Sequence, residues 1–182
     1  MNGPTLASFT TDRLVAEQLT MLHLPDLRCM DQDPQFMAYL GGIRDSAGTE
    51  QYLETNLAHW AQHGFGLWVL RERQSRMLVG RAVVRRISIG DTSEVEIGYG
   101  LLPAFWGRGL GREIARACVQ IGLQRLGSAS VIALAAPGNT ASHRVLHRVG
   151  PQREREIVHQ QLPMLLFRSS DAPRDPEAGG HS

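Results

Sequence analysis

The chain has 182 residues, 42% of them hydrophobic, and a formal net charge of +1 from 19 basic and 18 acidic residues. This length suits one domain with a sizeable core, and the near-neutral balance argues against a nucleic-acid-binding protein. All 19 basic residues are arginine, which excludes reactions that need a Schiff-base lysine or a phosphate-loop lysine.

The ends of the chain and its cysteines predict a soluble, cytoplasmic protein. No apolar stretch approaches membrane-spanning length, and the amino terminus lacks the pattern of a signal peptide. Cys29 and Cys118 are too few for a disulfide scaffold or a zinc cluster, and Cys118 suits a buried apolar position. We expect a flexible segment over residues 1–10, one domain over residues 11–168 and a disordered tail over residues 169–182.

The first half of the domain predicts a strand, helices and then three strands. Residues 13–19 form a candidate first strand, and residues 24–42 read as one or two short helices. Thr49 opens an amphipathic helix that Gly64 ends. The next strands are expected over residues 66–73, 77–89 and 93–102. Their short, turn-like joins favour an antiparallel meander.

The second half changes to an alternation of helix and strand. A glycine cluster leads into a helix that ends near Gly127, residues 130–136 form an apolar strand, and a second helix closes at Gly150. This order implies a right-handed crossover with parallel strands, and residues 153–161 and 163–170 suit a final hairpin. The predicted fold class is α/β, with a single mixed sheet that joins an antiparallel N-terminal meander to a parallel βαβ crossover.

The segment FWGRGLGREIARACVQ places three glycines just before a helix. A helix start exposes unpaired N–H groups and a partial positive charge, so it attracts phosphate. Gly107, Gly109 and Gly111 remove the Cβ atoms that would hold an anion away, and Arg108 and Arg112 add charge. We interpret this loop as a pyrophosphate site, and the alternative is a glycine-rich turn without a ligand.

Spacing excludes two familiar phosphate-binding motifs. A Rossmann fingerprint that starts at Gly107 requires glycine where Arg112 stands, which weakens the hypothesis of a nucleotide-binding redox domain. The phosphate loop of nucleotide hydrolases requires a lysine, and the sequence has none. A different ligand that carries phosphate is needed.

Longer segments resemble a known family. The stretch VEIGYGLLPAFWGRGLGREI, followed further along by NTASHRVLHRVG, resembles the Gcn5-related N-acetyltransferase (GNAT) superfamily, in the branch of the ribosomal-protein alanine and serine N-acetyltransferases. The opening segments TDRLVAEQLT and DPQFMAYLGG also resemble that branch, so the resemblance covers residues 11–168. It implies a GNAT-like fold and direct transfer of an acetyl group from acetyl-CoA to a primary amine in a ternary complex.

The resemblance also implies which residues bind acetyl-CoA. The amides of the glycine loop should hold the diphosphate. The segment from Tyr99 to Leu101 matches the place where the sheet splays at a bulge and the pantetheine arm adds like a short strand. A strand N–H there can polarise the thioester carbonyl, and Asn139 matches an asparagine that binds the arm near its sulfur. The implied coenzyme-binding residues are Tyr99, Gly100, Leu101, Gly107, Arg108, Gly109, Leu110, Gly111, Arg112 and Asn139.

Two positions depart from the catalytic pattern of the family. Many relatives carry an acid tyrosine where this chain has Leu146, and some carry a glutamate base where it has Leu134, so neither role transfers. Ser142 is a candidate for a hydroxyl that faces the sulfur, because the branch commonly has serine there. The alternative for Ser142 is an ordinary first-turn residue bonded to the backbone.

The reaction needs a base, because an amine at neutral pH is mostly ammonium. Glu94 and Glu96 lie two residues apart on the strand that leads to the bulge, so they share one face unless the bulge intervenes. Glu96 is the stronger candidate, acting directly or through a water. The alternative is a solvated strand carboxylate, or one paired with an arginine such as Arg85 or Arg86. No metal is expected.

Other side chains have simpler interpretations. His143 and His147 are spaced for a metal pair, but their arginine neighbours and the lack of a nearby carboxylate favour exposed helix histidines. Trp60, Phe65 and Trp68 are candidates to line an acceptor pocket, but such aromatic residues more often belong to the core.

The sequence leaves the acceptor open. The branch includes enzymes that act on protein amino termini and others that act on small amines, and no motif decides between them. We expect neither a nucleic acid nor a membrane partner, and either a monomer or a homodimer. The competing hypothesis is a non-catalytic sensor or scaffold that binds acyl-CoA, which the apolar residues Leu134 and Leu146 favour.

Overall fold

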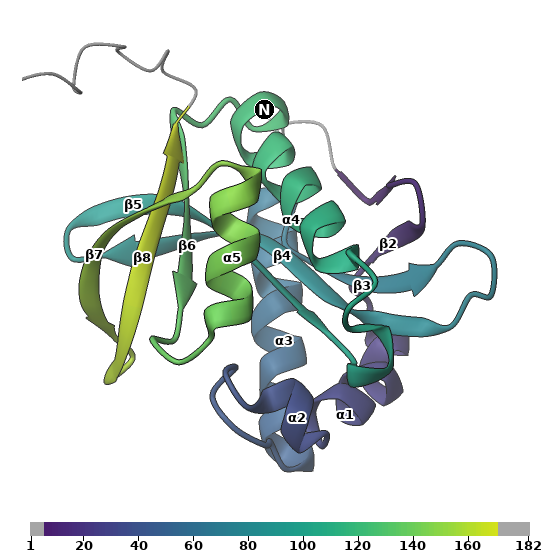
Figure 1. Ribbon diagram of the computed structural model, residues 1–182. Coiled ribbons are helices and arrows are strands. Elements are labelled where there is room, and N and C mark those ends of the chain that lie inside the picture. The colour runs from purple at the N-terminus through teal and green to yellow at the C-terminus, as the bar shows by residue number, and fades with distance from the viewer. Residues whose placement is uncertain (1–5, 171–182) are drawn as a thin grey trace, which may run out of the picture.

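A computed structural model describes residues 6–170, which form one mixed sheet flanked by helices (Figure 1). The eight strands pair in the order β1-β2-β3-β4-β5-β6-β8-β7. The strands are β1 (Ser8–Thr10), β2 (Leu14–Gln18), β3 (Leu67–Glu72), β4 (Leu78–Ile89), β5 (Thr92–Leu101), β6 (Ser130–Ala135), β7 (Gln152–His159) and β8 (Leu162–Ser170). The helices are α1 (Leu24–Asp31), α2 (Pro34–Met37), α3 (Ser46–His63), α4 (Leu110–Gln120) and α5 (Thr140–Val149). The expected mixed α/β sheet is confirmed.

The sheet extends slightly beyond the expected domain limits. β1 lies inside the segment that was expected to be flexible and pairs with β2, and β8 continues to Ser170. Residues 1–5 of the expected flexible segment and residues 171–182 of the expected tail lie outside the described residues.

Strands β3 to β5 form the expected antiparallel meander, and β2 pairs antiparallel with β3. Branched apolar side chains occupy most of the buried positions of these strands. β4 and β5 pair from Gly80 opposite Leu101 to Ile89 opposite Thr92 without a shift of register. The bulge expected near Tyr99 is therefore absent from this ladder. The unbroken β4–β5 ladder supports the site with a continuous series of backbone hydrogen bonds.

Helix α3 begins three residues earlier than the sequence suggested. Asp45 caps it, because its carboxylate accepts a hydrogen bond from the Gly48 N–H at 2.7 Å. Thr49, the expected start, is buried and donates its hydroxyl to Asp31 instead. The predicted end is confirmed, because Gly64 adopts the left-handed conformation that stops the helix.

The helices cover the two faces of the sheet. In Figure 1, α4 and α5 lie on the near face, α3 lies on the far face, and α1 and α2 lie at the lower end. Trp60 and Trp68 are buried and pack edge-on, with ring centroids 5.3 Å apart. Phe65 and Cys118 are buried as well. The assignment of these side chains to the core is confirmed.

The crossover and the final hairpin are also confirmed. α4 connects β5 to β6, and these two strands pair in parallel. A π-helical turn over Ile121–Arg125 prolongs α4. β8 inserts antiparallel between β6 and β7. Among the described residues, no helix combines the length and apolar character needed to cross a membrane.

Candidate active site

The sheet opens where β5 meets β6. Within residues 6–170 the two strands pair only at Glu96 opposite Ile132, so no ladder joins them beyond that point. A cleft of about 820 Å³ occupies the opening. Tyr52 of α3 and Cys118 of α4 both line it, although these helices lie on opposite faces. The cleft therefore passes through the sheet.

The edge of β5 along this opening carries unpaired backbone groups. The Leu102 N–H donates to the Val79 carbonyl at 2.8 Å, which fixes the phase of the β4–β5 ladder. Bonded and non-bonded pairs alternate in an antiparallel ladder, so Gly100 directs its backbone groups to β4. Tyr99 and Leu101 then direct their N–H groups to the opening. These two residues lie in the segment where the sequence predicted the pantetheine contact.

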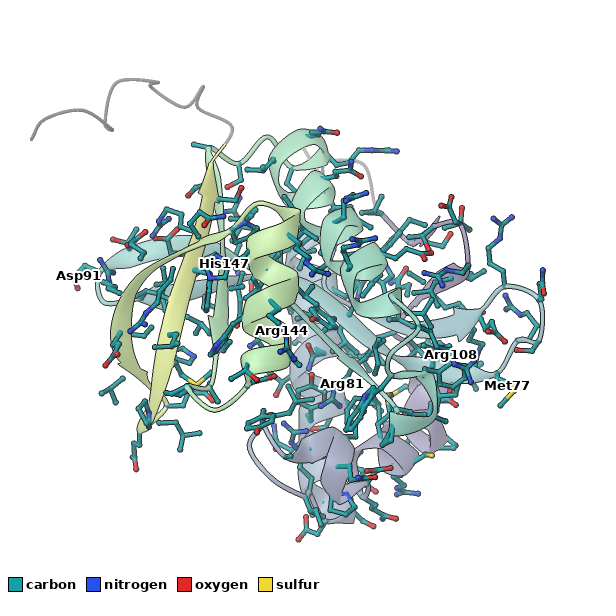
Figure 2. All side chains as sticks on the ribbon, in the orientation of Figure 1. Met77, Arg81, Asp91, Arg108, Arg144 and His147 are labelled. Atoms are coloured by element: carbon teal, nitrogen blue, oxygen red, sulfur yellow. The ribbon has the colours of Figure 1, made fainter. Side chains whose placement is uncertain are left out.

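Helix α4 begins at an open turn. Gly107 and Gly109 have φ angles of 73° and 77°, in the left-handed region that favours glycine. No side chain caps the helix at Gly109, so its first N–H groups are available to an anion. Arg108 and Arg112 are exposed beside this turn, and Arg108 is labelled in Figure 2.

The third glycine serves packing rather than anion access. A Cβ on Gly111 would lie 3.1 Å from a ring carbon of Tyr99, so this glycine lets α4 approach β5. This corrects the interpretation that all three glycines clear space for phosphate. The loop also lies outside the large cleft: Gly109 and Arg112 line a separate hollow of about 360 Å³ along α4.

A carboxylate on α4 ties the glycine loop to the start of β2. Glu113 accepts hydrogen bonds from the Thr11 hydroxyl and from the Arg13 N–H and guanidinium. Arg13 also donates to the Arg108 carbonyl at 2.7 Å. Burial by itself would raise the pKa of Glu113, but these bonds lower it. Sequence reasoning missed this contact, because Thr11 and Glu113 are 102 residues apart.

Asn139, Ser142 and Tyr99 meet at one wall of the cleft. Asn139 caps α5, accepting the Ser142 N–H at 3.2 Å, and its Nδ2 amide has no partner in residues 6–170. Burial raises the pKa of Tyr99, and the nearby Ser142 side chain partly opposes that shift. Leu146 is buried on the same helix. The contact between Tyr99 and Ser142 was not predicted.

Glu96 is paired with an arginine, which was the alternative interpretation, and its role as a base stays a prediction. It lines the cleft, and Arg85 on β4 donates Nε to its Oε2 at 2.5 Å. Burial by itself would lower the pKa of Arg85, but the charge and the hydrogen bond of Glu96, together with Tyr52, raise that pKa. The other oxygen, Oε1, has no partner within the described range. Glu94, in contrast, binds Arg168 with both oxygens and does not line the cleft.

A second charged group lies on the α3 side of the cleft, and sequence reasoning missed it. We call it the arginine cluster, defined as Asp31, Arg44, Tyr52 and Arg81. Its members come from α1, the loop before α3, α3 and β4. No local sequence pattern links them, because only the folded chain brings them together.

The rings of His143 and His147 bond groups of the protein itself. The His143 ring bonds the Ala136 carbonyl at 3.0 Å, and the His147 ring bonds the Gln152 side chain at 3.1 Å. His147 is exposed as expected, whereas His143 is half-buried. The described part of the chain contains no group of three metal-binding side chains.

The amino-acid sequence matches a known family and two curated relatives. A family model described as an acetyltransferase (GNAT) domain matches residues 13–152. YkkB of Bacillus subtilis (strain 168) is 28% identical over 153 residues, which cover 78% of this chain and 89% of that protein. YoaA of the same organism, named an N-acetyltransferase, is 26% identical over 157 residues, covering 82% and 87%.

Solved structures share the fold. An acetyltransferase from Agrobacterium tumefaciens str. C58 gives a TM-score of 0.77 at 22% identity, over 88% of this chain and 92% of that one. RimL, a ribosomal L7/L12 alpha-N-protein acetyltransferase in complex with coenzyme A, gives 0.73 at 14% identity, over 88% and 95%. AAC(6')-Ib in complex with ribostamycin and coenzyme A gives 0.72 at 18% identity, over 88% and 94%. The family match across most of the chain, on a sheet that opens beside an uncapped helix, shows that this protein belongs to the GNAT acetyltransferases.

Proposed function

We propose that the protein transfers an acetyl group from acetyl-CoA to a primary amine while both substrates are bound. The observation that carries the proposal is the unpaired edge of β5 beside the uncapped start of α4. Family membership supports acetyl transfer in general, and relatives solved with coenzyme A support the choice of cosubstrate. The amine acceptor and the direct transfer are our proposals.

The coenzyme fits the groups that the fold leaves unpaired. The N–H groups from Gly109 to Arg112 suit a diphosphate, and nearby arginines add positive charge. The N–H of Leu101 suits an amide carbonyl of a pantetheine arm that runs along β5, and the N–H of Tyr99 is left for the thioester. Asn139 offers its free Nδ2 amide to the end of that arm. The coenzyme therefore enters from the α4 side and leaves the α3 side to the acceptor.

The acceptor amine must be neutral when it attacks the thioester carbon. We assign Glu96 the role of taking the ammonium proton through its free Oε1, directly or through one water. Arg85 holds the opposite oxygen and fixes the orientation of the carboxylate. As the C–N bond forms, the N–H of Tyr99 stabilises the negative charge on the thioester oxygen.

The reaction ends when the nitrogen gives its second proton to solvent, the C–S bond breaks and the thiolate takes a proton. We assign that proton to the Ser142 hydroxyl, which is replenished from the Tyr99 phenol or from solvent. Cys118 is the one cysteine among the described residues that line the cleft, and burial raises its pKa to about 12. A thiol that stays protonated is a poor nucleophile, which supports direct transfer over an acyl-cysteine intermediate.

Two assays test the proposal. Calorimetry with CoA should give a saturable heat, and thiol release from acetyl-CoA should depend on an added amine. A panel of dipeptide amides and small diamines covers both acceptor classes that the fold neighbours represent. Binding without turnover across the panel favours the acyl-CoA sensor. Well-folded protein that gives no heat with CoA overturns the proposal.

A further inference from the structure

The acceptor side of the cleft carries more positive than negative charge. Three arginines line the cleft, Arg44, Arg81 and Arg85, whereas Glu96 is the one carboxylate among its described lining residues. Asp31 lies behind the wall, fully buried, and binds two of the three arginines. Three guanidinium charges against two carboxylate charges leave one positive charge without a partner.

Arg44 holds that unmatched charge. Arg85 is bonded to Glu96, and Arg81 is buried with its Nη1 at 2.7 Å from the Asp31 Oδ1. Arg44 binds the same oxygen through its Nη1 at 2.9 Å. The second oxygen of Asp31 accepts the Thr49 hydroxyl, so Arg44 has only a share of the oxygen that Arg81 also binds. The Nε and Nη2 groups of Arg44 have no oxygen partner within residues 6–170.

Aromatic side chains hold the arginine cluster in place. The guanidinium carbon of Arg44 lies 4.3 Å from the centroid of the Tyr52 ring, and that of Arg81 lies 4.7 Å from the same centroid. Phe36 adds a contact to Arg81 at 5.1 Å. Arg81 is labelled in the lower central part of Figure 2, above α2. A guanidinium that is fixed in advance loses less entropy when it binds.

The geometry points to an acceptor amine that also carries a carboxylate, held by the free edge of Arg44 while the amine faces Glu96. The planar N–H groups of a guanidinium match the two oxygens of a carboxylate. A polycationic amine would meet the unmatched charge of Arg44 and be repelled. The inference rests on the proposed function and narrows its acceptor class.

The test compares probes that differ only in the charge far from the amine. The full-length protein is titrated by calorimetry with 4-aminobutanoate, 4-aminobutanamide and 1,4-diaminobutane, each with and without saturating CoA. Alanylglutamate, alanylglutamine and alanylarginine amides form a second series for peptide acceptors. We expect the anionic member of the productive series to bind about tenfold more tightly than its neutral analogue, and the cationic member to bind most weakly.

Variants assign the preference to one side chain. Arg44→Gln should abolish the preference for the anion, whereas Arg44→Lys should keep part of it because the charge remains. Arg28→Gln is the control, because Arg28 also joins α1 to α3, through an exposed ion pair with Glu50, but does not line the cleft. Thermal melts verify that each variant is folded.

Failure of this inference differs from failure of the proposed function. Equal binding of the three probes in both series, absence of binding by all of them, or a preference that survives in Arg44→Gln overturns the carboxylate site. Loss of CoA binding or of acetyl transfer, with the anion preference intact, overturns the proposed function and leaves the carboxylate site standing.

Discussion

The proposed coenzyme site and the proposed acceptor side of the cleft use different parts of the polypeptide. On the coenzyme side, the groups offered to the ligand are mainly backbone N–H groups of β5 and of the α4 start. On the acceptor side they are side chains, above all the arginine cluster and Glu96. Backbone groups are the same in every residue, so they suit a constant cosubstrate. Side chains differ from one protein to the next, so they suit a variable acceptor.

This contrast predicts that mutations on the acceptor side change turnover more than coenzyme affinity. Glu96→Gln keeps a hydrogen-bond acceptor for Arg85 but removes the base, so kcat should fall about 100-fold while the Kd of CoA stays unchanged. Steady-state kinetics and calorimetry measure the two values. Glu94→Gln is the matched control on the same strand, because Glu94 binds Arg168 away from the cleft. Equal losses of kcat in both variants would contradict the role of Glu96.

A change in the backbone of the coenzyme side should have the opposite signature. Gly109 has a φ of 77°, which a β-branched residue resists, so Gly109→Val should raise the Kd of CoA about 30-fold. Gly90→Val is the control: its φ of 59° imposes similar strain in the β4–β5 turn, far from the loop. A CoA affinity that is unchanged in Gly109→Val, or equally weakened in both variants, would count against the pyrophosphate loop.

Ser142 lines the cleft, and its loss should have an intermediate effect. Ser142→Ala removes the hydroxyl that contacts Tyr99, and kcat should fall about tenfold with little change in KM for acetyl-CoA. Thr140→Ala, in the same first turn but exposed, tests whether any lost hydroxyl there matters. If the two variants behave alike, Ser142 serves only the fold of α5.

The smallest expected effect concerns the clamp behind the glycine loop. Glu113→Gln should lower the free energy of unfolding by about 1 kcal/mol at neutral pH. Because the pKa of Glu113 is lowered in the folded state, its contacts stabilise the protein at pH values above 4.5, the ordinary pKa of a glutamate. That stability is lost as the pH falls through the lowered value. Urea unfolding of the unmodified protein and of Glu113→Gln, measured from neutral to acidic pH, should show that the difference in their free energies of unfolding shrinks in acid. A difference that stays constant with pH would contradict the ionic origin.

The same contrast explains what the sequence could predict. The strands, the crossover and the glycine loop follow from local patterns, and Tyr99, Leu101 and Asn139 followed from the family resemblance. The phase of the β4–β5 ladder does not follow from the sequence. Gly100 was therefore predicted to bind the coenzyme together with Tyr99 and Leu101, although its backbone groups face β4. The arginine cluster was missed because no spacing rule links Asp31 to residues on β4 and α3.

Hydrogen exchange of individual backbone amides, followed by NMR with and without saturating CoA, tests the open edge of β5 most directly. We predict that the amides of Tyr99 and Leu101 exchange fast in the free protein and become protected with CoA, together with those from Gly109 to Arg112. Gly100, already bonded to β4, should be protected in both states. Slow exchange at Tyr99 and Leu101 without ligand, or no added protection with CoA bound, would contradict this account.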